Sequence, residues 1–265
     1  SKYIIICMDI YNNYYSQFCS NTIIIKLMIE IKNLDKSFDG NIILKDISTK
    51  FIQGKTNLII GQSGSGKTVL LKCLLGLHIP DNGEIIYDGF SNKKMTENQK
   101  TLLRREMGMV FQGSALFDSM TVLENVMFPL KMLTKKDEEE ITEKAENAIK
   151  RVELENAEKK LPSELSGGMQ KRVAIARAII DQPEFLIFDE PTAGLDPITG
   201  SSINELILDN VKRLGSTTIT ITHDITSMNV IADKVVMLNN GKIEWSGKKK
   251  DIVKCNNSFV QKFIK

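Results

Sequence analysis

Short apolar runs and amphipathic stretches alternate along this chain, and this pattern predicts an α/β fold. Runs with the length of buried strands cover residues 57–60, 185–188, 217–222 and 234–238, and those at 58–60 and 185–188 are continuously apolar. Residues 136–155 instead show apolar positions at helical spacing, at Ile141, Ala145, Ala148, Ile149 and Val152. We therefore expect a core sheet with a helical region inserted between two of its strands.

Polar and glycine positions predict where these elements begin and turn. Residues 28–60 are typical of short strands and turns, including Ile29–Ile31 and Ile47–Ile52. The sequence Asn-Asn-Gly-Lys at 239–242 indicates a hairpin turn between the last two strands. The acidic run at 137–140 favours a solvated helix N-terminus, where the helix dipole stabilises negative charge, over a metal site.

Composition fits one compact domain. The 265 residues are 42% hydrophobic and carry a net charge of +2, which gives no polyelectrolyte pattern for nucleic acid. The run Lys248–Lys250 is typical of a solvated helix start rather than a membrane patch. The 4 cysteines show neither C-x-x-C spacing nor a disulfide framework, which suits a reducing cytosol. No stretch approaches the roughly 20 apolar residues of a membrane span, so any transport needs other subunits.

Residues 1–27 differ in character from the rest of the chain. Most of its tyrosines lie there among Ile, Asn and Cys, without the cationic start and continuous apolar core of a signal peptide. From Met28 the sequence becomes strand-like. We expect Met28 to be the natural start and residues 1–27 to be non-native or disordered, from an upstream reading of an A/T-rich gene. The alternative is a genuine extension that packs on a partner.

A phosphate loop, G-x-x-x-x-G-K-T, lies between the apolar run ending at Ile60 and a helix-like run. Its glycines let backbone N–H groups point inward at a helix N-terminus, which makes an anion-binding nest. Lys67 would reach the β- and γ-phosphates, and Thr68 would give its hydroxyl to Mg²⁺. The alternative is a glycine-rich turn that binds nothing. The candidate nucleotide-binding residues are Gly61, Gln62, Ser63, Gly64, Ser65, Gly66, Lys67, Thr68 and Val69.

Two adjacent carboxylates follow the apolar run at 185–188. Asp189 is placed to hold the Mg²⁺ shell, and Glu190 is placed to orient and deprotonate an attacking water. Successive strand residues point to opposite faces, so the two acids need not share one task. The alternative is a strand end followed by an acidic turn.

A Leu-Ser-Gly-Gly sequence stands between the phosphate loop and these acids, with Ser166, Gly167 and Gly168 at the start of a helical run. Serine and glycine at a helix start again make an anion site, although such a cap alone is more often structural. In this order, the motifs resemble those of ATP-binding cassette (ABC) ATPases. The resemblance covers about residues 28–245.

Further positions match this family, each with a simpler alternative. Phe38 matches the aromatic residue on which adenine stacks, or it is a core aromatic. Gln112 matches the glutamine that contacts Mg²⁺ and water and links to the membrane subunit, or it is a surface residue. Asp196 matches the residue facing the opposite subunit, or it caps a helix. His223 matches the switch histidine near the γ-phosphate, or it is a satisfied core or surface residue.

The resemblance implies a fold, cofactors and partners. The fold is a RecA-like phosphate-loop core with an antiparallel β subdomain and a helical signature subdomain. The domain would span 28–247, with the helical subdomain at about 113–180 and a short helical tail at 248–265. The implied cofactors are ATP and Mg²⁺, with Thr68, Gln112 and Asp189 as metal ligands. Catalysis would use Glu190, His223, Gln112 and Lys67. Two copies would close head to tail, so that each ATP also meets Ser166, Gly167, Gly168 and Asp196 of the other copy.

The cargo is indicated by the segment after Gln112. Gly113–Phe117 and Met169 resemble ATPases of the Mla type, which power phospholipid trafficking between bacterial membranes. This implies a peripheral subunit on the cytoplasmic face of the inner membrane, with an integral permease and a periplasmic lipid-binding subunit of the MCE type. One alternative is an importer of a polar solute such as an amino acid. Another is a soluble ABC protein of DNA repair or translation, which is disfavoured because paired cassettes, coiled-coil insertions and zinc motifs do not appear.

Overall fold

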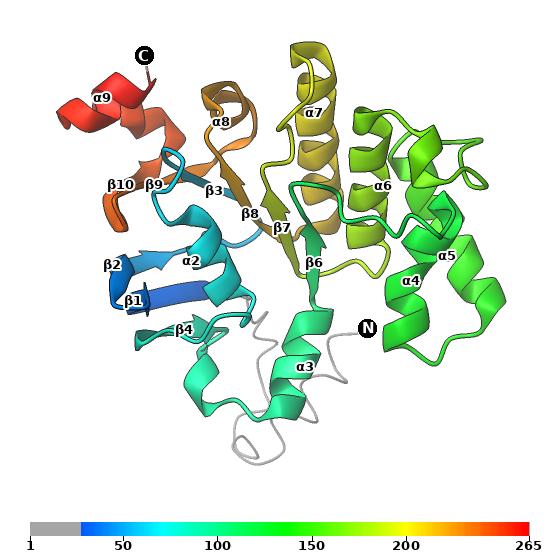
Figure 1. The fold of residues 1–265 in the computed structure, drawn as a ribbon, viewed down its shortest axis with the longest axis horizontal. Coiled ribbons are helices and arrows are strands. Elements are labelled where there is room, and N and C mark those ends of the chain that lie inside the picture. The colour runs from blue at the N-terminus through cyan, green and yellow to red at the C-terminus, as the bar shows by residue number, and fades with distance from the viewer. Residues whose placement is uncertain (1–27, 265) are drawn as a thin grey trace, which may run out of the picture.

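The computed structural model describes residues 28–264, whose strands form two sheets flanked by helices (Figure 1). The expectation for residues 1–27 lies outside the described residues. The first sheet is antiparallel, with strand order β2-β1-β4-β5, and we call it the antiparallel sheet. Its strands are β1 (Ile29–Phe38), β2 (Asn41–Lys50), β4 (Asn82–Tyr87) and β5 (Phe90–Ser91).

The strand expected at Ile47–Ile52 was wrong at both ends. Strand β2 starts at Asn41 and stops at Lys50. Asn57 causes this stop, because its Oδ1 accepts from the Ile52 N–H at 2.7 Å and its Nδ2 donates to the Ile52 carbonyl at 2.9 Å. Both main-chain groups of Ile52 therefore pair with a side chain instead of a neighbouring strand.

The second sheet, which we call the central sheet, has the order β10-β9-β3-β8-β7-β6. All neighbours in it are parallel except the hairpin of β9 with β10. That hairpin turns at Asn240 and Gly241, with φ of 47° and 73°, which confirms the predicted turn. The strands are β3 (Thr56–Ile60), β6 (Met107–Val110), β7 (Phe185–Asp189), β8 (Thr217–Thr222), β9 (Lys234–Asn239) and β10 (Lys242–Lys248).

Helices cover both faces of the central sheet. No helix within residues 28–264 combines the length and the apolar character needed to cross a bilayer. The α-helices are α2 (Lys67–Leu74), α3 (Glu97–Arg105), α4 (Val122–Leu133), α5 (Glu138–Arg151), α6 (Gly167–Ile179), α7 (Pro197–Leu214), α8 (Ile225–Ile231) and α9 (Ser258–Ile264). The 3₁₀ turns are η1 (Asn92–Lys94), η2 (Pro162–Glu164) and η3 (Lys249–Lys254).

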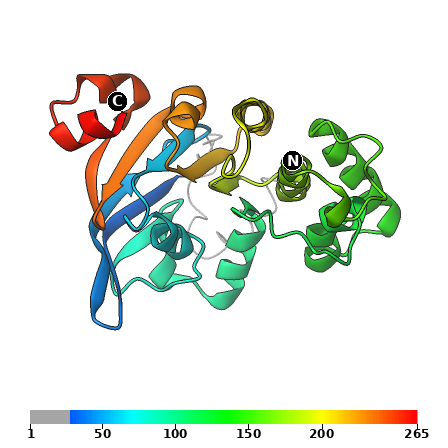
Figure 2. The same cartoon turned by 45° about the horizontal axis from the view of Figure 1, so that its top comes forward.

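Strand β7 separates two hydrophobic layers, because successive side chains point to opposite faces. Phe185 and Ile187 pack in the cluster that contains residues of α2 and the antiparallel sheet. Leu186 and Phe188 pack in the cluster that contains residues of α6 and α7. Both views accordingly show α2 and α6 on opposite sides of the strands (Figures 1 and 2). The phosphate-loop helix and the Ser-Gly-Gly helix are therefore held apart within one chain.

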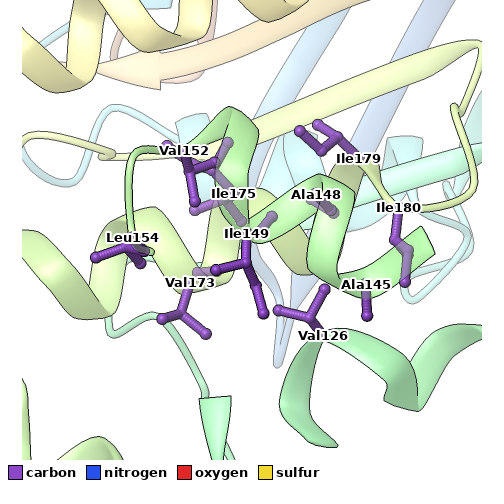
Figure 3. Close-up of a cluster of buried hydrophobic side chains, with 14 of the residues drawn as sticks. Val126, Ala145, Ala148, Ile149, Val152, Leu154, Val173, Ile175, Ile179 and Ile180 are labelled. Atoms are coloured by element: carbon purple, nitrogen blue, oxygen red, sulfur yellow. The ribbon is translucent and has the colours of Figure 1, made fainter. Parts of the chain in front are cut away.

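Helices α4, α5 and α6 share the second of these layers, and Figure 3 shows part of it. The apolar positions predicted on α5, such as Ile141 and Ile149, are buried there. The helix expected at 136–155 is shorter than predicted. Asp137 caps its start by accepting from the Glu140 N–H at 2.8 Å, which agrees with the acidic N-terminus expected there. The helix ends at Arg151, and Glu153 follows with a left-handed φ of 56°.

Candidate nucleotide-binding site

The phosphate loop connects β3 to α2 in a conformation that needs its glycines. Gly66 has a φ of 102°, and a Cβ there would lie 2.8 Å from Leu44 Cδ2. A Cβ at Gly61 would lie 2.3 Å from the Leu238 carbonyl oxygen, which no side chain tolerates. Gly64 also has a left-handed φ of 78°, with open space around the Cβ position. The chain therefore turns tightly enough to present backbone N–H groups at the start of α2.

Lys67 lies across the phosphate loop. Its ammonium donates to the carbonyls of Gly61 at 2.8 Å and Gln62 at 3.0 Å. Burial lowers the pKa of Lys67, while Glu190 and Asp189 act in the opposite direction. A cation held by neutral carbonyls, with two carboxylates nearby, is placed to exchange those carbonyls for phosphate oxygens. The buried Ser65 Oγ has no hydrogen-bond partner among the described residues, so a polar group in the loop is also left for a ligand.

The carboxylates stand at the C-terminal end of β7, as predicted. Burial raises the pKa of Asp189, Glu190 raises it further, and Lys171 and Lys67 oppose both effects. Glu190 follows the strand with a left-handed φ of 47°. Such a φ is uncommon for a residue with a Cβ and occurs often at functional sites.

Glu190 reaches across to the end of the neighbouring strand β8. Its Oε1 lies 2.9 Å from Nδ1 of His223, so the ring donates when it carries its proton on Nδ1. The Glu190 side chain is only 12% exposed, whereas the His223 side chain is 60% exposed. His223 is therefore on the surface, and the alternative of a core histidine does not hold. Asp224 follows it and caps α8, which fixes the backbone on the other side of His223.

The oxygens near this strand end suit a magnesium ion. Asp189 offers a partly buried carboxylate, and Thr68 and Gln112 are exposed at the ends of the phosphate loop and β6. Hydroxyl, amide and carboxylate oxygens are the ligands that Mg²⁺ prefers, and it usually keeps waters and phosphate oxygens as its other ligands. No cluster of three or more His, Cys, Asp or Glu residues within 28–264 forms a complete metal cage. The residues present therefore fit a metal that arrives with a nucleotide.

Ser166 is the N-cap of α6, and its Oγ accepts from the Met169 N–H at 3.3 Å. A Cβ at Gly168 would lie 2.6 Å from Thr199 Cγ2 of α7, so this glycine allows α6 and α7 to approach closely. Asp196 caps α7 by accepting from the N–H groups of Ile198 and Thr199 at 3.0 Å each. The structure thus shows helix caps at both positions, and both caps are exposed.

The structure brings some of the predicted residues together and keeps others apart. Lys67, Asp189, Glu190 and His223 gather where β3, β7 and β8 end. Ser166 starts a helix on the other face of the central sheet, and its side-chain hydrogen bond stays within that helix. Within one chain the central sheet thus separates the start of α6 from the phosphate-loop helix.

Two cations of α6 that sequence reasoning missed hold the loop after β6. Lys171 is buried, and its ammonium donates to the Gln112 carbonyl. The guanidinium of Arg177 donates to the carbonyls of Ser114 and Ala115 at 2.7 Å each. Ser114 and Ala115 both have a left-handed φ, 62° and 46°, so a strained turn is fixed by a side chain from α6. In the sequence, Lys171 and Arg177 stand out only as cations on the otherwise apolar face of a helix.

The next part of this loop is tied to α4. The fully buried Asn125 accepts from the Phe117 N–H at 2.8 Å and donates to the carbonyls of Phe117 and Met120 at 3.1 and 3.0 Å. The Phe117 ring packs on Phe128 at 4.5 Å between centroids and remains 40% exposed. A rigid loop therefore presents an apolar surface, which we call the docking patch: Ala115, Leu116, Phe117 and Met120.

Phe38 stands at the exposed end of β1. It is 38% exposed, so the alternative of a core aromatic does not hold. Its ring meets that of His78 edge to face, with centroids 5.1 Å apart. Lys36 places its ammonium 5.1 Å from the ring centroid.

Comparisons with known proteins agree with this arrangement. The family model of the ABC transporter matches residues 44–193. The L-cystine import ATP-binding protein TcyC of Bacillus subtilis (strain 168) is 42% identical over 223 residues, which are 83% of this chain and 90% of that protein. The chloroplastic protein TRIGALACTOSYLDIACYLGLYCEROL 3 of Arabidopsis thaliana is 38% identical over 253 residues, 89% of this chain and 73% of that protein. A dimeric post-hydrolysis state of the ATP-binding cassette MJ0796, bound to ADP and Pi, has a TM-score of 0.75 at 33% identity, covering 83% and 98% of the two chains.

Proposed function

The chain belongs to the ABC transporter family and is an ATPase of that family, and we propose that its ATP hydrolysis drives phospholipid transport between the inner and outer membranes of a bacterium. ATPases of this family form dimers and work with membrane permeases. In this proposal the chain is peripheral on the cytoplasmic face of the inner membrane. Its partners are a permease and a periplasmic lipid-binding subunit of the MCE type.

We assign the chemistry to the residues at the ends of β3, β7 and β8. Lys67 binds the β- and γ-phosphates, and Glu190 orients a water and takes its proton. His223 holds the Glu190 carboxylate through Nδ1, which leaves Nε2 to contact the γ-phosphate. Thr68, Asp189 and Gln112 would hold a Mg²⁺ ion, which would supply positive charge to balance the charge that develops on the phosphate. Phe38 stacks on the adenine.

The second half of each site comes from the other copy in the dimer. Ser166 and the N–H groups at the start of α6 form an anion site, and the helix dipole adds to it. In one chain this helix lies on the opposite face of the central sheet from α2. A head-to-tail dimer would overcome this separation, because it brings α6 of one copy to the phosphate loop of the other.

The docking patch links this cycle to the permease. Lys171 and Arg177 tie the patch to α6. Gln112, which would be a metal ligand, lies in the same loop. When α6 of one copy closes on the ATP of the other, the loop after β6 moves with it. The patch is apolar and partly exposed, which supports contact with an apolar helix end of a permease.

The proposal of a lipid cargo rests on the 38% identity to the Arabidopsis protein, whose name contains the name of a glycolipid. The resemblance of Gly113–Phe117 to Mla-type ATPases supports the same cargo. The second candidate is import of an amino acid, which the 42% identity to the cystine import protein favours. Both candidates use the same ATPase and differ only in the partners.

The test is purification of the intact complex from native membranes through a tag on this chain, followed by mass spectrometry. The lipid proposal expects a permease, a membrane-anchored lipid-binding subunit and glycerophospholipid above the background of an unrelated membrane protein from the same membranes. A soluble solute-binding protein in the complex, together with ATP hydrolysis stimulated by L-cystine or methionine, would refute the lipid cargo in favour of the second candidate.

A further inference from the structure

The segment that follows the phosphate-loop helix returns to the end of β1, where Phe38 lies. Helix α2 ends at Leu74, and the N–H groups of Leu77 and His78 still bond to the Lys72 carbonyl at 2.8 and 3.1 Å. The segment 75–81 is therefore held on α2. It carries His78 and Asp81, which both contact the last residues of β1.

Asp81 makes more contacts with β1 than an ordinary surface carboxylate. Its Oδ1 accepts from the Lys36 ammonium at 2.7 Å. Its Oδ2 accepts from both the backbone N–H and the hydroxyl of Ser37, at 2.6 Å each. Its own N–H donates to the Asp35 carbonyl at 2.9 Å. Three consecutive residues before Phe38 are thus bound by one residue.

The hydrogen bonds to Asp81 stabilise its ionised form. The hydrogen bonds from Lys36 and Ser37 lower the pKa of Asp81 to about 2, so it is ionised at every physiological pH. The Lys36 ammonium that pairs with it also lies 5.1 Å from the Phe38 ring centroid. Asp81 therefore places the cation beside the ring as well as the backbone that carries the ring.

We propose that Asp81 is a positioning residue for the adenine of ATP, which it serves by fixing Phe38 relative to the phosphate loop. One continuous segment holds the phosphate nest at its start, in the loop before α2, and Asp81 at its end. The distance between the phosphate site and the aromatic platform is thereby set within that segment. The inference rests on the proposed role of Phe38 in stacking on adenine.

The competing explanation is that Asp81 only stabilises a surface turn. Its side chain is 38% exposed, and an exposed ion pair adds little to stability. A stabilising role would affect every ligand of the phosphate loop alike. A positioning role would affect only ligands that carry a base, and only while Phe38 is present.

The experiment uses the full chain with Glu190→Gln, in which ATP is expected to bind without being hydrolysed. Dissociation constants of ATP and of inorganic triphosphate are measured by calorimetry for Asp81→Ala, Phe38→Ala and the double variant. Asp209→Ala, at an exposed aspartate of α7, is the matched control. Asp81→Asn is the second variant, because it keeps an oxygen acceptor but loses the charge, and thermal unfolding checks that each variant is folded.

We expect Phe38→Ala to weaken ATP roughly 5- to 100-fold, as loss of base stacking does. Asp81→Ala should weaken ATP roughly three- to tenfold, with an intermediate effect for Asp81→Asn. Triphosphate binding should not change in any of them. In the Phe38→Ala background, Asp81→Ala should have no further effect on ATP.

Each other result contradicts a stated part of the proposal. If Phe38→Ala leaves ATP binding unchanged, the adenine platform is wrong and the inference fails with it. If Phe38→Ala weakens ATP but Asp81→Ala and Asp81→Asn do not, the platform stands and the positioning role is refuted. Equal weakening of ATP and triphosphate by Asp81→Ala, or an undiminished effect in the double variant, also refutes it.

Discussion

Replacing Asn125 by alanine should loosen the docking patch and destabilise the whole chain. Asn125 is fully buried and makes three hydrogen bonds to residues 117–120: one accepted from the Phe117 N–H and two donated to the carbonyls of Phe117 and Met120. A fourth goes to the Thr121 carbonyl, at the start of its own helix. At about 1 kcal/mol of net stability each, the loss of the first three costs about 3 kcal/mol. Alanine regains roughly 0.5 kcal/mol through its better helix propensity. We therefore expect Asn125→Ala to lower the free energy of unfolding by about 2–3 kcal/mol.

The matched control is Asn147→Ala, which makes the same substitution at an exposed position of α5. There only the helix propensity changes, so a gain of roughly 0.5 kcal/mol is expected. Urea unfolding of both variants gives the comparison, and amide hydrogen exchange should be faster in the 113–121 loop of Asn125→Ala alone. If the two variants unfold with the same free energy, the Asn125 hydrogen bonds do not hold the loop as described.

Three further changes test the site and its coupling. Glu190→Gln should keep ATP bound while turnover falls by about a hundredfold or more, since the amide cannot take a proton; a rate near wild type by phosphate release would remove Glu190 from its role. Leu116→Glu should release the permease in a pull-down while ATP hydrolysis by the isolated chain stays unchanged, and an intact complex would mean that the patch is not the docking surface. Burial raises the pKa of Asp189, so its protonation should weaken Mg²⁺ binding as the pH falls, beginning at a higher pH than for an ordinary aspartate. Asp189→Asn should bind Mg²⁺ weakly and lose that pH dependence. An unchanged Mg²⁺ affinity in this variant would exclude Asp189 as a ligand.

The parts of the fold that the sequence predicted correctly depend on local chemistry. The hairpin at 239–242 follows from the preference of Asn and Gly for left-handed turns, and the cap at Asp137 follows from helix N-terminal chemistry. The strand ends at Ile60 and Asp189 were found because a buried strand is a continuous apolar run. Each of these signals involves only residues that are close together in the sequence.

What the sequence missed depends on contacts between distant residues. Asn57 ends β2 by bonding to Ile52, and no pattern in the strand itself shows this. Lys171 bonds to a carbonyl 59 positions earlier in the chain, and Arg177 bonds to carbonyls 62 and 63 positions earlier. In the turn after Phe111 the left-handed residues are Ser114 and Ala115 rather than the adjacent Gly113, so turn propensity alone would not place them, and the contact from Arg177 holds that geometry.

The head-to-tail dimer is tested most directly by mixing two defective chains. One copy carries Lys67→Ala and the other Ser166→Arg, each in a Glu190→Gln background that traps ATP. In the head-to-tail arrangement the mixed dimer has one intact site, formed by Lys67 of the second copy and Ser166 of the first. We predict one trapped ATP per purified mixed dimer and none in either homodimer. If the mixed dimer traps no ATP while the Glu190→Gln dimer alone traps two, each site lies within a single chain and the account is wrong.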